Sequence, residues 1–420
     1  MRPAAAPAVR RGTARKLGIV PSRSGIEPNE MRDELDSGAA PEPAQPERRL
    51  TRRTLLAAGF AGVGAIAGAS YLASRLTGDG KEALRPAPAG SGGDTLAELA
   101  RNVTSGGPPK DGIPSIDEPK FVAAGSARFL ADDDVVFGLE LGGEARAYPQ
   151  LVLVWHEIVN DKVGDRPISV TYCPLTGSTV AFRGTSARGE ALTFGTSGDL
   201  VNSNLLMYDR ETDSRWPQIL GQAIVGPSRG RRLEEIPLQW TTWRHWRRAH
   251  PDTRVLSTDT GFLRNYGDDP YGSYNPLGGY YKRSSSDLFF PVLNDDSRFP
   301  RKDVFVGAKL AEVRLAVRKD VVRRERAVMA RMGRSRVAFL HDPDLDDVRA
   351  YRAHAGGRAL LLAPGSERGR YVDEATGSVL DARGGIVSGP LRGSELERVT
   401  SYDVMWFAWA AFFRDSEVLG

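Results

Sequence analysis

The hexapeptide DRETDS at residues 209–214 returns later in the chain as DEATGS at residues 373–378. Other matches keep the same order and nearly the same spacing, and they pair Gly138 with Gly307, Gly226-Pro227 with Gly389-Pro390, Trp243 with Trp406 and Trp246 with Trp409. Ordered matches at a near-constant spacing indicate an internal repeat. We therefore expect an internal duplication, with a first lobe at residues 114–260 and a second, degenerate lobe at residues 300–420.

Each expected lobe mixes short strands with helices. Alternating apolar and polar residues from Val135 to Tyr148, around Gly142-Gly143, predict a β-hairpin. Apolar residues between Leu151 and Ile158 recur at helical spacing after Pro149, and the Arg- and Ala-rich stretch 317–332 predicts a helix in the second lobe. Further predicted elements are strands at residues 168–173, 179–183, 191–193 and 205–208 and a helix at residues 243–249. The expected fold class is α+β, with two tandem related lobes of short antiparallel strands plus helices.

Three segments outside the two lobes lack the periodicity of packed elements. Residues 1–50 are rich in Ala, Pro, Arg and Glu and predict a disordered leader. Residues 76–113 are rich in Gly, Pro and Ser and predict a linker. Residues 261–299 form a long, aromatic, turn-rich insert, and loops of this kind often carry function or contact partners.

The segment between the leader and the linker resembles a twin-arginine (Tat) export signal. Arg52-Arg53 precede the uncharged, Ala- and Gly-rich stretch 54–74, which ends at Arg75. Paired arginines before a weakly hydrophobic core are typical of signals that the Tat translocon recognises. Residues 51–75 therefore predict export to the cell envelope, periplasmic or extracellular, with the signal either cleaved or retained as a membrane anchor through residues 54–74.

Charge and cysteine content exclude several classes of protein. The 57 Lys and Arg residues nearly balance the 53 Asp and Glu residues, and the excess of positive charge lies in residues 1–75. A body without net positive charge argues against nucleic acid as a partner. The single cysteine, Cys173, excludes an internal disulfide and a Cys-rich zinc cluster. The sequence has no phosphate-binding loop and no dinucleotide-binding glycine motif that would support a nucleotide cofactor.

Cys173 and His156 are the candidate site residues. Cys173 stands where a predicted strand enters a tight turn, and His156 lies on the preceding predicted helix. In a first interpretation the two side chains ligate a soft metal, for which copper is the best match to a thiolate plus an imidazole. Met207 or Met405 would then add a thioether ligand.

Two other interpretations of Cys173 stay open. In the second, Cys173 is a catalytic nucleophile whose pKa is lowered by His156, while Glu157 or Asp161 orients the imidazole. In the third, Cys173 is a small buried residue and His156 is a hydrogen-bonded structural residue. His156 and Cys173 fall on Glu325 and Asp342 in the second copy, which favours a function confined to the first copy.

Two further groups of polar residues have predicted roles. The repeated turn is expected to be structural, with Asp209 and Thr212 bonding to turn amides. Asn202 and Asn204, near Ser197 and Asp199, either line a pocket or cap loops.

Several strings together resemble a large family of exported bacterial and archaeal proteins known only as a domain of unknown function. The resemblance covers roughly residues 108–420 and implies an extracytoplasmic protein without an assigned activity. In many relatives the turn after the cysteine looks like Cys-Pro-Leu-Cys, whereas Thr176 stands at the last position here, which argues against a dithiol or two-thiolate role. The strings are PPKDGIPSIDEPKF, ARAYP, WHEIVND, VTYCPLTGS, SGDLVNSNLLMYDRETDSRWPQILGQAIVGP and HPDTRVLS.

The leading functional prediction is a metal-binding or redox-accessory protein of the cell envelope that uses Cys173 and His156. One alternative is a cysteine-dependent hydrolase or transferase. A second alternative is a structural or interaction module that uses the aromatic residues at 271–290 of the insert.

Overall fold

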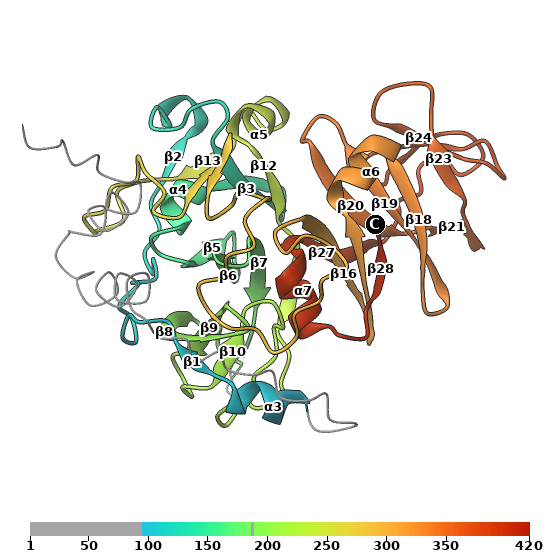
Figure 1. Cartoon of the computed structure of the whole chain (residues 1–420). Coiled ribbons are helices and arrows are strands. Elements are labelled where there is room, and N and C mark those ends of the chain that lie inside the picture. The colour runs from blue at the N-terminus through green and yellow to red at the C-terminus, as the bar shows by residue number, and fades with distance from the viewer. Residues whose placement is uncertain (1–94, 186–188) are drawn as a thin grey trace, which may run out of the picture. The chain divides into compact units, whose positions relative to one another are not determined.

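A computed structural model of the chain describes residues 95–185 and 189–420 (Figure 1). The predicted leader at 1–50, the predicted export signal at 51–75 and the first half of the predicted linker, residues 76–94, lie outside the described residues. The expected first lobe, insert and second lobe lie within residues 114–420, and their boundaries stay predictions.

The first part of the described chain contains strands in three sheets. Their orders are β1-β8-β9-β10, β11-β7-β6-β5 and β12-β3-β4-β13-β2. The elements are α3 (Thr95–Arg101), β1 (Thr104–Ser105), β2 (Phe121–Ala123), η1 (Ala124–Ser126), β3 (Val135–Leu141), β4 (Glu144–Pro149), α4 (Gln150–Leu153), β5 (Ile158–Val163), β6 (Arg166–Cys173), β7 (Ser178–Arg183), β8 (Phe194–Val201), β9 (Asn204–Asp209), β10 (Arg215–Pro217), β11 (Glu234–Ile236), β12 (Gln239–Thr242), α5 (Trp243–Ala249) and β13 (Arg254–Leu256).

The later part contains the insert and a large sheet, which is antiparallel except for the parallel pair β17–β28. The insert carries the hairpin β14–β15, and the large sheet has the order β18-β19-β20-β27-β16-β17-β28. The elements are β14 (Gly272–Tyr274), β15 (Leu277–Gly279), β16 (Val304–Leu310), β17 (Val313–Arg318), α6 (Lys319–Glu325), β18 (Ala327–Met332), β19 (Ser335–Asp342), β20 (Asp347–Arg352), β21 (His354–Ala355), β22 (Arg358–Ala359), β23 (Leu362–Pro364), β24 (Arg370–Asp373), β25 (Val379–Asp381), β26 (Ile386–Ser388), β27 (Arg398–Met405), α7 (Trp406–Phe412) and β28 (Glu417–Leu419).

The expected α+β class is wrong, because the described residues are β-rich, with 43% of them in strands and 11% in helices. The predicted helix after Pro149 stops at Leu153. Ile158, the first residue of β5, already pairs with Thr171 of β6. In the stretch 317–332, only Lys319–Glu325 is helical. The residues on either side of α6 pair with neighbouring strands, so strand pairing overrides the helical propensity of Arg and Ala.

Other predicted elements are confirmed. The hairpin around Gly142-Gly143 is β3–β4, and both glycines have the positive φ that a two-residue turn between twisted strands requires. The predicted strands at 168–173, 179–183 and 205–208 lie within β6, β7 and β9. The predicted helix at 243–249 is α5. Residues 191–193 form an isolated bridge at Ala191 instead of a strand.

The two halves share an order of elements and a pattern of pairing. β3 pairs with β4 and β12 as β16 pairs with β17 and β27, and β13 and β28 add in parallel to β4 and β17. A tryptophan packs on a glycine at the same place in each half, Trp246 on Gly138 and Trp409 on Gly307, where a Cβ atom would overlap the ring.

One hydrophobic core runs through both halves. A single cluster joins Ile158 and Cys173 from the first half to Val404 and Trp409 from the second. The N–H of Met405, at the end of β27, donates to the carbonyl of Thr176 at 3.0 Å, and β27 lies beside β7 (Figure 1). The turn that follows Cys173 therefore lies where the two halves meet.

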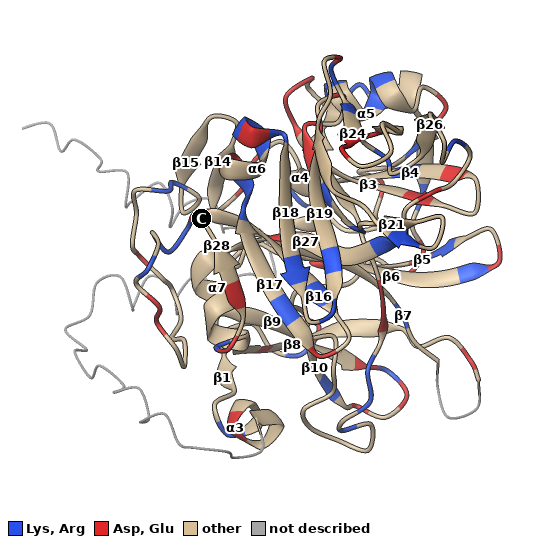
Figure 2. Ribbon diagram, turned by 90° about the vertical axis from the view of Figure 1, so that its right-hand side faces the viewer, with Lys and Arg blue, Asp and Glu red and all other residues tan. Residues whose placement is uncertain are grey.

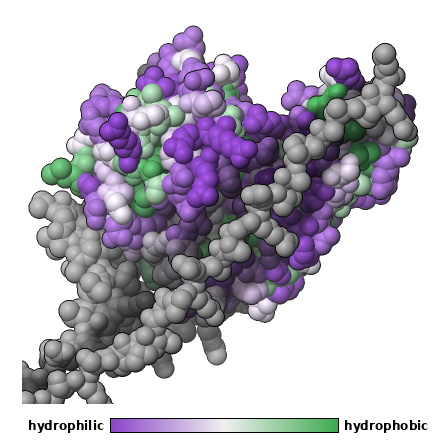
Figure 3. Space-filling view, turned by 90° about the horizontal axis from the view of Figure 1, so that it is seen from above, coloured by the Kyte–Doolittle hydropathy of each residue, from purple (hydrophilic) through white to green (hydrophobic). Residues whose placement is uncertain are grey.

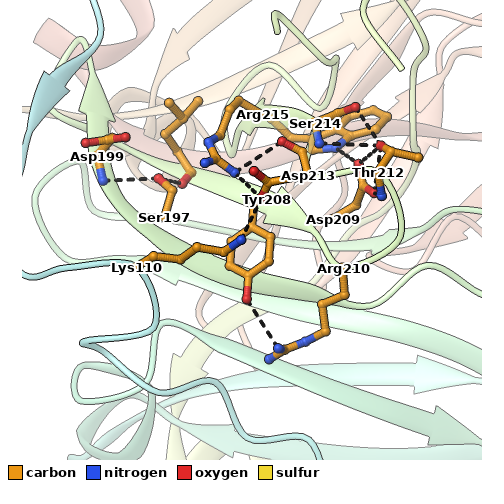
Figure 4. A network of polar contacts seen from close by, with 12 residues as sticks. Lys110, Ser197, Asp199, Tyr208, Asp209, Arg210, Thr212, Asp213, Ser214 and Arg215 are labelled. Atoms are coloured by element: carbon orange, nitrogen blue, oxygen red, sulfur yellow. Dashed lines mark hydrogen bonds and ion pairs between the residues drawn. The ribbon is translucent and has the colours of Figure 1, made fainter. Parts of the chain in front are cut away.

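The repeated turn is structural, as predicted. The carboxyl of Asp209 accepts from the N–H of Thr212 at 2.6 Å and from the indole of Trp216 at 2.8 Å (Figure 4). In the second half, Asp373 accepts in the same way from the N–H of Thr376 at 3.1 Å. Such turns satisfy backbone amides that would otherwise lose their hydrogen bonds on burial.

The surface mixes residues of both charges. Figure 2 shows Lys and Arg interspersed with Asp and Glu over the strands, and Figure 3 shows a mainly hydrophilic face with small hydrophobic patches. Within residues 95–185 and 189–420, no helix combines the length and the apolarity that a membrane span needs.

Candidate functional site

A buried glutamate, Glu157, marks the site. After α4 the chain turns into β5, and Glu157 stands in this turn with a φ of 57°, in the left-handed region that side chains rarely adopt. Its N–H donates to the carbonyl of Leu153 at 2.6 Å, and its carbonyl accepts from the N–H of Tyr172 at 2.8 Å. The fold therefore holds this unusual backbone conformation on both sides, and such conformations cluster at functional sites.

The side chain of Glu157 lines a cavity of about 120 Å³. Aromatic side chains make up much of the wall, with Trp155 beside Glu157 and Tyr271, Phe289 and Phe290 from the insert. Other wall residues come from stretches far apart in the sequence, at residues 106–113, 196–205 and 264–271. The insert therefore completes the cavity.

The carboxyl group of Glu157 has no hydrogen-bond partner in the described part of the chain. Glu157 is 7% exposed, and burial raises the pKa of its carboxyl from 4.5 to about 8. Burying a carboxyl without a partner costs several kcal/mol, and it favours the protonated form. At neutral pH the group is therefore mostly neutral and can either donate or accept a proton.

The second half shows what a satisfied side chain looks like at the corresponding turn. Arg326 lies between α6 and β18 as Glu157 lies between α4 and β5, and it has a φ of 65°. Its guanidinium donates to the carbonyls of Gly365, Glu367 and Arg370 at 3.0, 2.8 and 3.3 Å. The protein thus provides partners for this side chain in one half, whereas in the other half the side chain faces a cavity.

Two other charged residues line the cavity. Asp199 is half-buried, and its carboxyl has no ion pair within the described ranges. Arg264 is also half-buried, and its guanidinium donates to the carbonyl of Leu263 at 2.9 Å. The cavity therefore carries two carboxyl groups and one guanidinium among aromatic walls.

Cys173 ends β6 in the core, next to the cavity. It is 1% exposed, and burial together with the charge of Glu157 raises the pKa of its thiol to about 11. The N–H of Leu205 donates to its sulfur at 3.4 Å, and the thiol lies 3.9 Å from the carbonyl of Ser203. Near neutral pH Cys173 is therefore a protonated thiol.

His156 is fully buried and hydrogen-bonded at both ring nitrogens. Nδ1 lies 2.7 Å from the carbonyl of Pro114, and Nε2 lies 2.6 Å from the hydroxyl of Tyr266. Burial lowers the pKa of His156 to about 4, so the ring is neutral at physiological pH. Tyr266 belongs to the loop that carries Arg264, so His156 acts as a positioning residue for one wall of the cavity.

The structure places the two predicted site residues in different bonding networks. No described hydrogen bond joins Cys173 to His156, and neither Glu157 nor Asp161 bonds to the imidazole. Asp161 instead pairs with Arg146 at 2.6 Å.

The predicted thioether ligands and the predicted metal site can also be placed. Met207 and Met405 are buried in the same core as Cys173. Within the described ranges, no group of three or more His, Cys, Asp or Glu side chains is arranged to hold a metal ion. The roles predicted for Cys173, His156 and Met207, as metal ligands or as a catalytic pair, stay predictions.

The insert contributes a buried network of tyrosines behind the cavity. The carboxyl of Asp269 accepts from Gln150 at 2.7 Å and from the hydroxyl of Tyr281 at 2.9 Å. The hydroxyl of Tyr172 lies 3.0 Å from the hydroxyl of Tyr274. The ring of Tyr274 stacks on the ring of Tyr281, with centroids 3.9 Å apart. Several aromatic side chains of the insert therefore pack inside the protein.

The polar cluster predicted around Asn202 and Asn204 caps loops. The side chain of Asn204 accepts from the N–H of Ile219 at 2.9 Å, and that of Asn202 accepts from the N–H of Leu293 at 2.8 Å. Its neighbour Asp199 is the member of this group that lines the cavity.

Comparison with known protein families gives one match. Residues 110–416 match the family described as "Protein of unknown function (DUF3179)", and the match spans most of the chain. The chain belongs to this family. No curated protein and no solved structure matches the chain.

Four of the strings quoted in the sequence analysis contribute residues to the cavity wall. PPKDGIPSIDEPKF provides Pro109 and Gly112, and WHEIVND provides Trp155 and Glu157. VTYCPLTGS provides Leu175, and the long string that begins SGDLVNSN provides its first residues after Ser197. The cavity therefore lies where stretches distant in sequence meet, and membership of the DUF3179 family itself assigns no activity to it.

Proposed function

We propose that the protein binds a small organic ammonium ion in the cavity at Glu157. One observation carries this proposal: the carboxyl of Glu157 is buried at the cavity wall and has no hydrogen-bond partner among the described residues. A ligand with a positive charge would supply the missing partner and offset the cost of burying the carboxylate. A buried group with a shifted pKa in a cavity is a general mark of a binding site.

The cavity walls suit an organic cation better than a metal ion. Aromatic faces attract cations through their quadrupole, and Trp155, Tyr271 and Phe289 line the cavity. Asp199 adds a second carboxyl group. An alkylated ammonium ion has both the charge for Glu157 and the apolar surface for these rings.

The volume of the cavity limits the size of the ligand. A protein cavity of roughly 150 Å³ holds one benzene molecule. At about 120 Å³, the Glu157 cavity fits a compact group such as tetramethylammonium.

Calorimetric titration of the full chain with tetramethylammonium, at a pH above the pKa of Glu157, tests the proposal. We expect wild type to bind tetramethylammonium more tightly than tert-butanol, a neutral molecule of similar shape. We expect Glu157→Gln to weaken the binding of tetramethylammonium by about 10-fold or more, because removing one member of a desolvated charge pair costs roughly 2–5 kcal/mol.

The matched control for this variant is Glu118→Gln, at an exposed glutamate outside the cavity wall. It should bind tetramethylammonium like wild type. Equal affinity of wild type for the two probes, or unchanged binding by Glu157→Gln, would refute the proposal.

We further propose that the protein acts in the cell envelope after Tat export. Support comes from Arg52-Arg53 and the uncharged stretch 54–74, which have the order of a twin-arginine signal. Cell fractionation of the Arg52→Lys/Arg53→Lys double variant tests this: the variant should accumulate in the cytoplasm. Undiminished export of the variant would contradict it.

The predicted metal-binding or redox-accessory role of Cys173, His156 and Met207 has its own test. Copper content is measured in wild type and in Cys173→Ser after expression in copper-replete medium. A lower content in Cys173→Ser would support the role, and equal contents would contradict it.

A further inference from the structure

A second, larger cavity lies where the two halves and the insert meet. Its volume is about 340 Å³, within the range of roughly 300–1,000 Å³ typical of small-molecule sites. β12 of the first half, the β14–β15 hairpin of the insert, and α6 and the end of β27 of the second half line it. It shares no lining residue with the cavity at Glu157.

Two fixed aromatic rings form one wall of this junction cavity. Trp240 and Tyr274 meet edge to face, with centroids 5.1 Å apart. Trp240 also packs on Phe137, and the ring of Tyr274 stacks on Tyr281. Because neighbouring rings hold both residues, this apolar wall is preorganised. The two rings are nearly perpendicular, at 75°, so a flat apolar surface can stack on one of them and meet the other edge-on.

The floor of the junction cavity holds charges that already have partners of opposite sign. The ammonium of Lys319 lies 2.5 Å from Asp403 and 3.5 Å from Asp347. Lys319 and Asp403 are 8% and 7% exposed, so this ion pair is nearly buried. The pair offers hydrogen-bond donors and acceptors to a ligand without selecting either sign of charge.

The rim repeats this balance. Arg323 pairs with Asp346, and Asp320 pairs with Arg318 at 2.7 Å. Arg283 is an exposed lining residue without an ion pair in the described ranges. With nearly every charge matched by a neighbour, an ionic ligand would gain little, whereas a neutral ligand with many hydroxyl groups could share the existing hydrogen bonds.

We propose that the junction cavity binds a neutral sugar unit of a glycan. A pyranose ring has one apolar C–H face, which fits against the ring of Trp240, and a rim of hydroxyl groups that both donate and accept hydrogen bonds. Lys319 and Asp403 offer both kinds of partner on the floor of the cavity. This inference is independent of the ammonium site.

A glycan array probed with the fluorescently labelled full chain tests the proposal. We expect binding to neutral glycans and no preference for sulfated or carboxylated glycans. Trp240→Ala should weaken the binding of the best neutral glycan by about 10-fold or more, since an aromatic platform is a typical binding hot spot. Glu157→Gln should leave this binding unchanged.

A rim variant keeps the test decisive if Trp240→Ala does not fold. Leu277 lines the cavity and is 42% exposed, so Leu277→Trp should fold and block the entrance. Leu361 is also 42% exposed and lies outside the cavity lining, which makes Leu361→Trp the matched control. Absence of binding to any neutral glycan, a preference for charged glycans, or equal binding by the two Trp variants would overturn the proposal.

Discussion

Protonation of Glu157 should make stability depend on pH. The folded state keeps a proton on this carboxyl up to a pKa of about 8, whereas the unfolded chain loses it near the ordinary value of 4.5. Between these two pH values the folded state binds more protons, so the free energy of unfolding falls as pH rises, at up to roughly 1.4 kcal/mol per pH unit. Glu157→Gln lacks this term, and its stability relative to wild type should rise across the same window.

Urea unfolding of the two proteins at a series of pH values measures the effect. His156 acts in the opposite direction, since its lowered pKa costs stability as pH falls from 6.5 to about 4. Both proteins keep His156, so its contribution cancels in the difference between them, and the effect of Glu157 can be read from pH 4.5 to about 8. Parallel stability curves there would show that Glu157 titrates normally.

Cys173 should be unreactive in the folded protein. A thiol pKa of about 11 leaves roughly 300-fold less thiolate at neutral pH than an ordinary cysteine with a pKa near 8.5, and the side chain is buried. Iodoacetamide should modify Cys173 slowly in the folded protein and rapidly in urea. Fast modification of the folded protein would instead favour the predicted nucleophile.

The sequence pointed to Cys173 as the site residue because it is the single cysteine, whereas the structure points to the buried carboxyl of Glu157. Cys173 drew attention because it is the single cysteine, and its place at the end of a strand was predicted correctly. Glu157 is one of 53 acidic residues, and the prediction gave it a secondary role beside His156. Its positive φ is held by backbone hydrogen bonds to Leu153 and Tyr172, and the insert completes the cavity that its side chain lines. No local sequence pattern encodes these contacts.

Among the elements, the tryptophan–glycine contacts give a direct test. A Cβ atom at Gly138 would overlap the ring of Trp246, and both residues are buried. Gly138→Ala should lower the free energy of unfolding by about 1–3 kcal/mol, as overpacked cores do. Thermal denaturation measures the loss.

Gly125→Ala is the control for this variant, because nothing lies within 4 Å of a Cβ atom there. It should change stability little. If Gly138→Ala were as stable as the control, the tryptophan would have to move freely, contrary to its full burial.

Sequence periodicity predicted strands better than helices. Alternation identified the hairpin β3–β4, because successive residues of a strand face opposite sides of a sheet, and the strands β6 and β7 were also predicted. The apolar spacing from Leu151 to Ile158 fitted a helix equally well, and only the turn at Glu157 and the pairing of β5 with β6 end α4 early. Tertiary pairing, which joins residues distant in sequence, decided these cases.

For the whole molecule, a buried ion pair between the two halves gives a further test. The ammonium of Lys309 lies 2.6 Å from Glu235, and both side chains are nearly buried. Glu235→Gln leaves Lys309 without its counter-charge and should destabilise the protein by about 3 kcal/mol. The double variant Lys309→Met/Glu235→Leu should recover most of this loss.

Chemical denaturation checks both variants. We expect one transition in each case, because a single core cluster contains residues of both halves. Two separate transitions would mean that the halves fold independently, and a neutral Glu235→Gln variant would mean that the ion pair is solvated.

The repeat in the sequence predicts the related strand pairing within each half but not the contacts between the halves. It implies related halves, and the shared pairing of β3 and β16 has the matching pattern. The repeat does not tell that β27 docks beside β7, or that the insert closes two cavities. These contacts join different halves, so a comparison of one half with the other carries no information about them.

The missing hydrogen-bond partner of Glu157 has a consequence for how the proposed ammonium ligand would bind and be released. A positively charged ligand must displace the proton that the carboxyl of Glu157 keeps below a pH of about 8. Binding of each ligand is therefore an exchange of one cation for another. Lowering the pH would reverse this exchange, because protonation of Glu157 would release the ligand.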